Sequence, residues 1–291
     1  MKRARFGLGL AVVLFAGVPA WGAAGKGAGR AAHASGPQLR SGSALVLDTA
    51  TSDVLLAHNA ATPGSIASIT KLMTALVVLE GGQPLDETLT IGKDDALRAR
   101  GTPSRLAPGT SMTRGDLLHL ALMSSENRAA QSLASHYPGG LEACVAAMNQ
   151  KAKAIGMTHA RFVDPTGLGA GNVASPEDLA RLVEAAADNA TIREFSTDPH
   201  HDVRVGRQIL EYRNTDSLVR DPEWDVIVQK TGYTRSAGRC LVMKARVDGR
   251  ALVIVLLDSF GKYTRVADAR RIRKWLGAQA ALGGALASAG R

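Results

Sequence analysis

The sequence predicts a mixed α/β protein of the α+β kind, with an antiparallel sheet built from both chain ends and a helical lobe inserted between them. Short runs of strand character occur before residue 60 and again after residue 220. Between about residues 67 and 200, apolar residues instead recur at helical spacing. Asp248-Gly249, a strong two-residue turn signal, joins the last two strand runs as a hairpin.

The first 24 residues are expected to be a signal peptide. Lys2, Arg3 and Arg5 precede an apolar run from Phe6 to Val18, and small residues follow. Because that run is shorter than the roughly 20 residues of a membrane-spanning helix, we expect a cleaved leader, a periplasmic protein and no membrane anchor in the mature chain. An uncleaved N-terminal anchor is the alternative interpretation.

The rest of the chain is expected to hold one large domain. Residues 25–40 are small and polar and predict a flexible linker. The domain itself is expected at 41–276, a length that allows two lobes. Residues 277–291 are expected to be a flexible tail, since they lack the basic and bulky apolar faces of a helix that lies on a membrane.

Two strands and a helix are expected at the start of the domain. Residues 41–60 indicate two short strands around a polar turn. A helix then begins at Ser68, runs to Glu80 and ends at the glycines that follow.

Four more helical segments should complete the lobe. Thr113 and Asp116 cap the first, and the second runs from Asn127 to His136. The third carries an apolar stripe over residues 141–155, and the fourth begins at Ser175-Pro176.

Three strands and a final helix are expected at the end of the domain. The strands are "WDVIVQKTGYT", "GRCLVMKARV" and "RALVIVLLDS", and "YTRVADARRIRKWL" has the pattern of an amphipathic helix. We expect a cleft where the sheet meets the helical lobe.

Composition excludes several classes of function. The formal net charge is +9, but aromatic residues are only 4% of the chain and no basic stripe is interleaved with them, so no nucleic-acid partner is expected. An anionic extracellular polymer suits this charge. The histidines lack metal-ligand spacing, His200-His201 is expected to be a loop pair, and neither a metal nor a cofactor is predicted. Cys144 and Cys240 are expected to be small buried thiols, although a disulfide between them stays open.

Three short motifs carry the chemistry: Ser68-Ile69-Thr70-Lys71, Ser125-Glu126-Asn127 and Lys230-Thr231-Gly232. Each alone is weak, because the second could be a helix cap and the lysines could be solvated. Together they form an ordered set: the first opens a helix, the second lies between two helices and the third belongs to a strand. This combination predicts a serine acyl-transfer site that contains no histidine.

The first two motifs supply the reacting groups. Positions i and i+3 share a helix face, so the Lys71 amine can reach the Ser68 hydroxyl. A serine needs a base to become a good nucleophile, and a lysine becomes one when desolvation and nearby cations lower its pKa. Ser125 could relay a proton to the leaving amine, and Asn127 could hold Lys71 and the substrate amide.

The third motif supplies substrate contacts. Lys230 and Thr231 offer a cation and a hydroxyl to a substrate carboxylate, and Gly232 leaves room for the substrate at a strand edge. The N–H groups of Ser68 and Tyr233 are the expected oxyanion donors.

The three motifs together resemble the signature of penicillin-binding proteins and serine β-lactamases. The segments "PGSIASITKLMTA", "LMSSENRAAQSLASHYPGG", "RFVDPTGL", "QKTGYTRSAGRCLVM" and "FGKYTRVADA" are similar to the low-molecular-mass D-alanyl-D-alanine peptidases, above all to the short endopeptidase type known as penicillin-binding protein 7. The resemblance covers residues 41–276. It implies the serine β-lactamase/DD-peptidase-like fold, an acyl-enzyme mechanism on the D-Ala-containing stem peptides of peptidoglycan, and β-lactams as covalent inhibitors.

The resemblance also implies the roles of four residues: Ser68 as nucleophile, Lys71 as base, Ser125 as proton relay and Lys230 in substrate binding. The short stretch after Gly232 favours the soluble endopeptidase type, which cleaves D-Ala cross-links, over anchored carboxypeptidases, which remove terminal D-Ala. The basic residue that completes carboxylate binding is either Lys262 or Arg265, and the sequence leaves this choice open.

Two alternatives remain from the sequence. A serine β-lactamase of class A needs a glutamate after the helical lobe to activate a deacylating water, but "RFVDPTGLGAGNVASPEDL" lacks the Glu-x-x-Leu-Asn pattern and Asp164 is expected to be a turn residue. A non-catalytic sensor of β-lactams or wall fragments is the second alternative, and turnover of a stem peptide would separate it from an enzyme.

Overall fold

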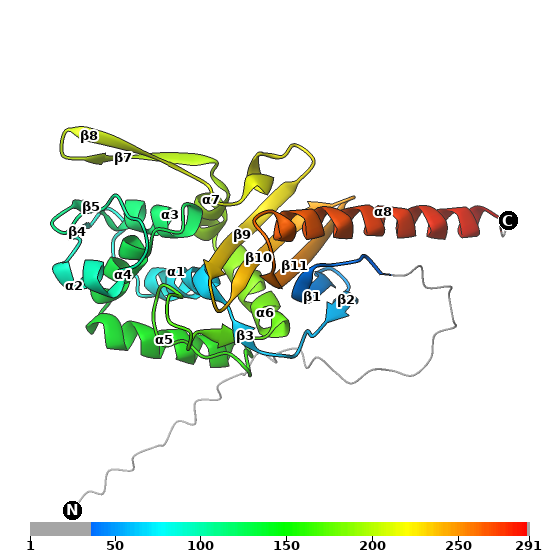
Figure 1. Ribbon diagram of the computed structural model, residues 1–291, viewed down its shortest axis with the longest axis horizontal. Helices are drawn as coiled ribbons and strands as arrows, with labels where there is room; N and C mark the ends of the chain where they lie inside the picture. The colour runs from blue at the N-terminus through cyan, green and yellow to red at the C-terminus, as the bar shows by residue number, and fades with distance from the viewer. Residues whose placement is uncertain (1–35, 290–291) are drawn as a thin grey trace, which may run out of the picture. The chain divides into compact units, whose positions relative to one another are not determined.

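The structure is a computed structural model that describes residues 36–289 (Figure 1). The expected signal peptide and most of the expected linker therefore lie outside the described residues. Within the described part of the chain, no helix is long and apolar enough to cross a membrane.

One five-stranded antiparallel sheet contains strands from both ends of the described chain, as the sequence predicts. Its strand order is β2-β1-β11-β10-β9, so the first strand pairs with the last. The strands are β1 (Ser41–Asp48), β2 (Val54–His58), β9 (Asp225–Thr234), β10 (Gly238–Val247) and β11 (Arg250–Ser259). Strand β9 is an edge strand, and its outer edge lies beside the turn that carries Ser68.

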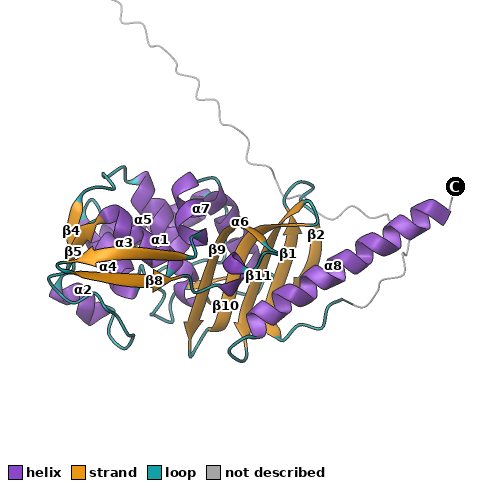
Figure 2. Ribbon diagram, turned by 90° about the horizontal axis from the view of Figure 1, so that it is seen from above, coloured by secondary structure: helices purple, strands orange, loops and turns teal. Residues whose placement is uncertain are grey.

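The helical lobe lies between β2 and β9 in the sequence, and a last helix follows the sheet. The lobe contains α1 (Thr70–Glu80), α2 (Lys93–Arg98), α3 (Arg114–Met123), α4 (Asn127–Ser135), α5 (Gly140–Ala154), α6 (Pro176–Ala187) and α7 (Ala190–Thr197). Helix α8 (Thr264–Ala289) crosses the opposite face of the sheet (Figure 2).

Side-chain alternation along the strands produces two hydrophobic cores. Val242 and Val253 belong to the core shared with the helical lobe, whereas their neighbours Leu241 and Leu252 pack in the core beneath α8. Because successive strand residues point to opposite faces, a sheet covered on both sides needs apolar residues at nearly every position.

The predicted caps and turns are confirmed. The Thr113 hydroxyl accepts a hydrogen bond from the Asp116 N–H at the start of α3, and Ser175 and Asp178 form a capping box on α6. Asp248 and Gly249 both have positive φ values, 51° and 78°, as a tight two-residue hairpin requires.

The sequence did not predict the shorter elements. These are α2, α7, the 3-10 turns Ala67–Ile69 and Ser217–Arg220, the hairpin of β7 (His200–Val205) and β8 (Gln208–Arg213), and the pairs β3 (Gly64–Ser65) with β6 (Val173–Ala174) and β4 (Thr88–Thr90) with β5 (Ser111–Thr113). The prediction of His200-His201 as a loop pair is wrong, since both residues lie in β7. Val203 of β7 is buried in the hydrophobic core of the helical lobe. This packing helps to hold the segment against the lobe as a hairpin.

The expected flexible tail is also corrected, because α8 continues from Gly277 to Ala289. This stretch is rich in alanine and contains leucine and no proline. Adding such residues to a helix that is already formed is favourable, because the costly nucleation step has been made earlier in the chain.

Cys144 and Cys240 are both free, buried thiols. Burial raises the pKa of Cys144 to about 12 and that of Cys240 to about 11. Neither is therefore a reactive thiolate near neutral pH.

Candidate active site

Ser68 lies in a 3-10 turn, Ala67–Ile69, that leads into α1. Ala67 has a φ of 48°, which is unusual for a residue with a side chain. Two glycines allow other segments to approach this turn closely. A Cβ on Gly167 would lie 1.8 Å from the Ala67 carbonyl oxygen, and one on Gly232 would lie 3.1 Å from the Ser68 nitrogen. The nucleophile's backbone is thus clamped between β9 and the loop that contains Gly167.

Lys71 is almost completely buried, with 1% of its surface exposed. Its Nζ lies 2.9 Å from Ser68 Oγ, 2.6 Å from Asn127 Oδ1 and 2.7 Å from the carbonyl oxygen of Thr166. Desolvation lowers the pKa of Lys71 to about 7, and the charges of Asp164 and Glu126 oppose that shift. A substantial fraction of Lys71 is therefore neutral near pH 7.

The three neighbours of Lys71 determine where the lone pair of the neutral amine points. Such an amine has two N–H bonds and one lone pair. The Asn127 amide oxygen and the Thr166 carbonyl oxygen only accept hydrogen bonds, so they take the two N–H groups. The lone pair then faces the Ser68 hydroxyl, which is the arrangement that a general base requires.

The second motif lies at the start of α4. Glu126 is the N-cap and accepts a hydrogen bond from the Arg128 N–H, while Asn127 is the first helical residue. Ser125 has a φ of 63°, and its hydroxyl forms no hydrogen bond with any other residue that the structure describes. Its predicted role as proton relay stays a prediction.

The third motif lies on the edge strand. Lys230 is fully buried, and its Nζ donates a hydrogen bond to the Thr231 carbonyl at 3.0 Å. Burial lowers the pKa of Lys230 well below its usual value, the positive charges of Lys71 and Arg265 lower it further, and Asp216 opposes them. The hydroxyls of Thr231 and Thr215 are 2.6 Å apart.

The structure distinguishes between Lys262 and Arg265. Lys262 is exposed, and its Nζ lies 5.3 Å from the centre of the Tyr263 ring. Arg265 is partly buried, and its Nε and Nη1 are covered without a hydrogen-bond partner among the described residues. Because the charge of Arg265 also acts on Lys230, this guanidinium is the better placed of the two to bind a carboxylate beside β9.

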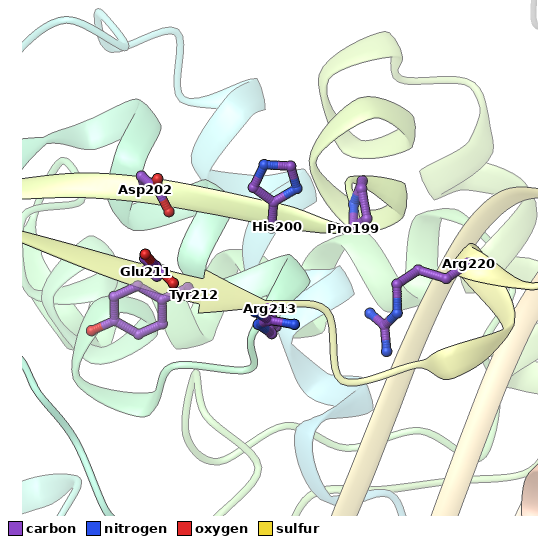
Figure 3. Close-up of a pocket in the computed structure, with 7 residues that line it drawn as sticks. All are labelled: Pro199, His200, Asp202, Glu211, Tyr212, Arg213 and Arg220. Atoms are coloured by element: carbon purple, nitrogen blue, oxygen red, sulfur yellow. The ribbon is translucent and has the colours of Figure 1, made fainter.

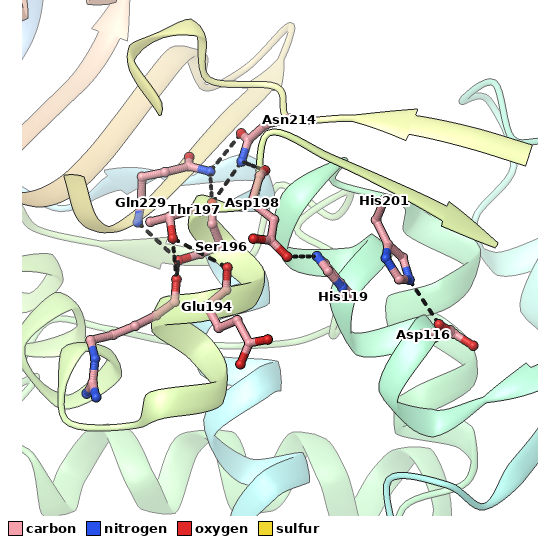
Figure 4. A network of polar contacts seen from close by, with 10 residues as sticks. Asp116, His119, Glu194, Ser196, Thr197, Asp198, His201, Asn214 and Gln229 are labelled. Atoms are coloured by element: carbon pink, nitrogen blue, oxygen red, sulfur yellow. Dashed lines mark hydrogen bonds and ion pairs between the residues drawn. The ribbon is translucent and has the colours of Figure 1, made fainter. Parts of the chain in front are cut away.

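A polar network behind β9 holds Gln229, the residue before Lys230, in place (Figure 4). The amide of Gln229 donates hydrogen bonds to the Ser196 carbonyl at 2.6 Å and to Asn214 Oδ1 at 2.9 Å. The Asn214 amide donates to the carbonyls of Ser196 and Asp198. These bonds join β9 to the end of α7 and to the base of the β7–β8 hairpin.

A stack of three rings holds the same hairpin against the lobe. His119 of α3 lies between Phe195 and His201, with ring centres 4.3 Å and 4.0 Å apart. His119 Nε2 lies 3.1 Å from Asp198, and His201 Nε2 lies 2.9 Å from Asp116. Figure 4 shows both contacts.

A separate hollow of about 410 Å³ lies at the base of the hairpin (Figure 3). It contains no residue of the three motifs and is lined by Pro199, His200, Asp202, Glu211, Tyr212, Arg213 and Arg220. Over the part of the chain that the structure covers, no group of three or more His, Cys, Asp or Glu side chains is placed to hold a metal ion.

Known proteins are similar to this chain in sequence. It matches the family described as D-alanyl-D-alanine carboxypeptidase over residues 30–261. It is 48% identical to a D-alanyl-D-alanine endopeptidase of Pseudomonas aeruginosa, over 82% of this chain and 78% of that protein. It is 44% identical to a D-alanyl-D-alanine endopeptidase of Escherichia coli, over 84% of this chain and 80% of that protein.

Solved structures agree with this relationship. The Streptomyces K15 DD-transpeptidase superposes with a TM-score of 0.77 at 26% identity, over 82% of this chain and 98% of that chain. A D-alanyl-D-alanine carboxypeptidase from Mycobacterium tuberculosis superposes with a TM-score of 0.74 at 28% identity, over 83% and 92% of the two chains. Because the family model, the relatives and the solved structures each match most of its length, this chain belongs to the D-alanyl-D-alanine carboxypeptidase family of serine peptidases.

Proposed function

We propose that this protein is a serine DD-peptidase of the periplasm that cleaves D-Ala-containing cross-links in peptidoglycan as an endopeptidase. Removal of terminal D-Ala, as a DD-carboxypeptidase, is the second activity that the same site supports. The relatives from Pseudomonas aeruginosa and Escherichia coli, 48% and 44% identical to this chain, are both named endopeptidases. The leader expected at residues 1–24 supports the periplasmic location.

Acylation begins when the Lys71 lone pair takes the proton of the Ser68 hydroxyl. The Ser68 oxygen attacks the carbonyl carbon of the D-Ala residue, and the N–H groups of Ser68 and Tyr233 stabilise the oxyanion that forms. Ser125 passes its hydroxyl proton to the leaving amine and takes the proton held by Lys71, so the peptide bond breaks and the Lys71 amine is neutral again. Lys71 then takes a proton from a water molecule as that water attacks the ester, and the proton returns to the Ser68 oxygen as the ester bond breaks.

The free edge of β9 aligns the substrate as an added strand. Gly232 carries no side chain on the face that the Ala67–Ile69 turn contacts, so β9 lies close to Ser68 and its backbone can pair with the peptide next to the nucleophile. Lys230, Thr231 and Arg265 hold the carboxylate next to the scissile bond. Holding the reacting groups together in this way contributes to the rate by replacing a collision with a fixed geometry.

The observation that carries this proposal is the buried Lys71 amine 2.9 Å from Ser68 Oγ, with acceptors on its other two sides. The test is digestion of purified cross-linked muropeptides, followed by chromatography and mass spectrometry, with Ser68→Ala as control. Conversion of dimers to monomers by the wild type alone supports an endopeptidase with Ser68 as nucleophile. Loss of terminal D-Ala alone would indicate a carboxypeptidase, and no change in either pool would favour the sensor.

Penicillins should remain bound to Ser68 for a long time. Asp164 accepts hydrogen bonds from the N–H and hydroxyl of Thr166 and from the N–H groups of Gly167 and Gly169, at 2.6–2.9 Å. Since these donors occupy the Asp164 carboxylate, it is not free to activate a deacylating water. We expect slow release of a fluorescent penicillin from the protein in a gel assay, and rapid multiple turnover would contradict this expectation.

A further inference from the structure

The orientation of the Asn127 amide depends on Thr102, a residue outside all three motifs. Thr102 lies in the loop between α2 and β5, residues 99–110. Asn127 Nδ2 donates a hydrogen bond to Thr102 Oγ1 at 3.1 Å, while Asn127 Oδ1 lies 2.6 Å from Lys71 Nζ. The two ends of one amide group therefore join this loop to Lys71.

Thr102 can only accept a hydrogen bond from Asn127. A hydroxyl has a single hydrogen, and that of Thr102 is donated to the Ala99 carbonyl at 3.0 Å. The lone pairs of Thr102 Oγ1 then need a donor, and the NH₂ of Asn127 is the group that supplies one. This contact fixes which end of the Asn127 amide faces Lys71.

A reversed Asn127 amide would prevent Lys71 from accepting the proton of Ser68. Its NH₂ group would point at Lys71 and offer a hydrogen to the amine lone pair. The lone pair would then be taken by Asn127 instead of accepting the proton of Ser68. An ammonium form of Lys71 would also lose an acceptor and meet a donor.

We propose that Thr102 is a positioning residue that keeps the Asn127 carbonyl oxygen toward Lys71 and so keeps the Lys71 lone pair toward Ser68. This proposal rests on the proposed role of Lys71 as base. It adds a residue that no motif contains and that acts through Asn127, without contact with the reacting atoms.

The test is the pH dependence of acylation by a fluorescent penicillin in Thr102→Val, which removes the hydroxyl at nearly constant shape. We expect the acylation rate at its high-pH plateau to fall about tenfold, as loss of one well-formed hydrogen bond to the base would cause. The midpoint of the profile should move to lower pH, because the ammonium form of Lys71 loses an acceptor. The other charged groups that act on Lys71 or Lys230 are unchanged in this variant; these are Asp164, Glu126, Asp216 and Arg265.

Two control variants separate orientation from loosening of the loop. Thr102→Ser keeps the hydroxyl and should restore the wild-type profile. Arg105→Ala removes another tether of the same loop, the hydrogen bond from the Arg105 guanidinium to the Glu211 carbonyl, and should leave the midpoint in place. Thermal melting of each variant checks that it is folded.

A double-mutant cycle completes the test. If Thr102 acts through Asn127, Thr102→Val should change nothing further in an Asn127→Ala background. Additive losses, or a Thr102→Val profile within twofold of wild type with the same midpoint, would overturn the proposal for Thr102 alone. A wild-type protein that fails to acylate, or a Ser68→Ala variant that still does, would instead overturn the proposed function.

Discussion

At the scale of single residues, the environment of Lys71 determines the pH range in which the site can react. The pKa of Lys71 is lowered to about 7 by desolvation, and only the neutral amine can accept the Ser68 proton. The acylation rate should therefore rise with pH through about 7 and level off above it. Stopped-flow fluorescence with a labelled penicillin measures this profile. Lys71→Arg, whose guanidinium stays protonated, should be inactive throughout, and a rate that does not depend on pH would refute the assignment.

Gly167 provides a second prediction at this scale. Gly167→Ala would place a Cβ 1.8 Å from the Ala67 carbonyl oxygen at a φ of 81°. We expect a loss of about 3 kcal/mol or more in the free energy of unfolding, from overpacking and backbone strain together. Gly109→Ala is the matched control, because Gly109 has a φ of 85° and no described heavy atom within 4 Å of the added Cβ. Urea unfolding that gives the same loss for both variants would show that the clash is unimportant.

The sequence predicted the residues of the site that have recognisable side chains and spacing. Ser68, Lys71, Asn127 and Lys230 all occur in short motifs, and both Ser68 and Asn127 lie within hydrogen-bond distance of Lys71 Nζ. The Thr166 carbonyl could not be predicted in this way, since every residue type carries a carbonyl. Thr102 also lies outside the motifs, and it meets its partner Asn127 only when the loop of residues 99–110 has folded.

At the scale of secondary-structure elements, the ring stack that holds the β7–β8 hairpin makes stability depend on pH. Burial, assisted by His201 and opposed by Asp116, lowers the pKa of His119 to about 4, from a usual value near 6.5. The unfolded chain then binds a proton that the folded chain does not, so stability falls as the pH drops from about 6.5 toward 4. The loss is on the order of 3 kcal/mol.

The variant His119→Phe tests this assignment. Phenylalanine can still stack between Phe195 and His201 but does not titrate, so the fall in unfolding free energy over this pH range should become shallower. His58→Gln, on the exposed strand β2, is the control and should keep the wild-type slope. An unchanged slope in His119→Phe would place the titration elsewhere in the molecule.

Elements with strong local signals were predicted correctly, and those that depend on distant contacts were missed. Helices α3 and α6 carry side-chain caps, and the β10–β11 hairpin carries its turn residues. Helix α2 has only six residues, and the β7–β8 hairpin is held by rings from α3 and α7 and by the amides of Asn214 and Gln229. Because these contacts come from other parts of the chain, the hairpin's own sequence carries little of the alternation of apolar and polar residues that predicts a strand.

At the scale of the whole molecule, Asp268 ties the first strand to the last helix. This fully buried carboxylate accepts hydrogen bonds from the N–H groups of Arg40 and Ser41 and from the Ser41 hydroxyl, at 2.7–3.0 Å. We expect Asp268→Ala to lower the free energy of unfolding by about 2–4 kcal/mol, because these three donors and the Arg271 guanidinium all lose their acceptor.

Urea unfolding measures this loss, which should occur in a single transition because the tie joins distant parts of one sheet and helix. Asp225→Ala is the control, since Asp225 forms an exposed ion pair with Arg246 and such pairs contribute little. An equally small effect of both substitutions would show that the ends of the domain are joined by packing alone.

The pairing of β1 with β11 also has a consequence for when the enzyme becomes active during its synthesis. Ser68 and Lys71 leave the ribosome early, but β11, which joins β1 to the rest of the sheet, is complete only at Ser259, and Arg265 comes later still. A nascent chain therefore holds its nucleophile before the sheet that supports Lys230 can close. Contacts between segments so far apart in sequence also form late in folding. The complete site thus forms only after β11 and Arg265 have been made, and a shorter chain carries the serine without the means to use it.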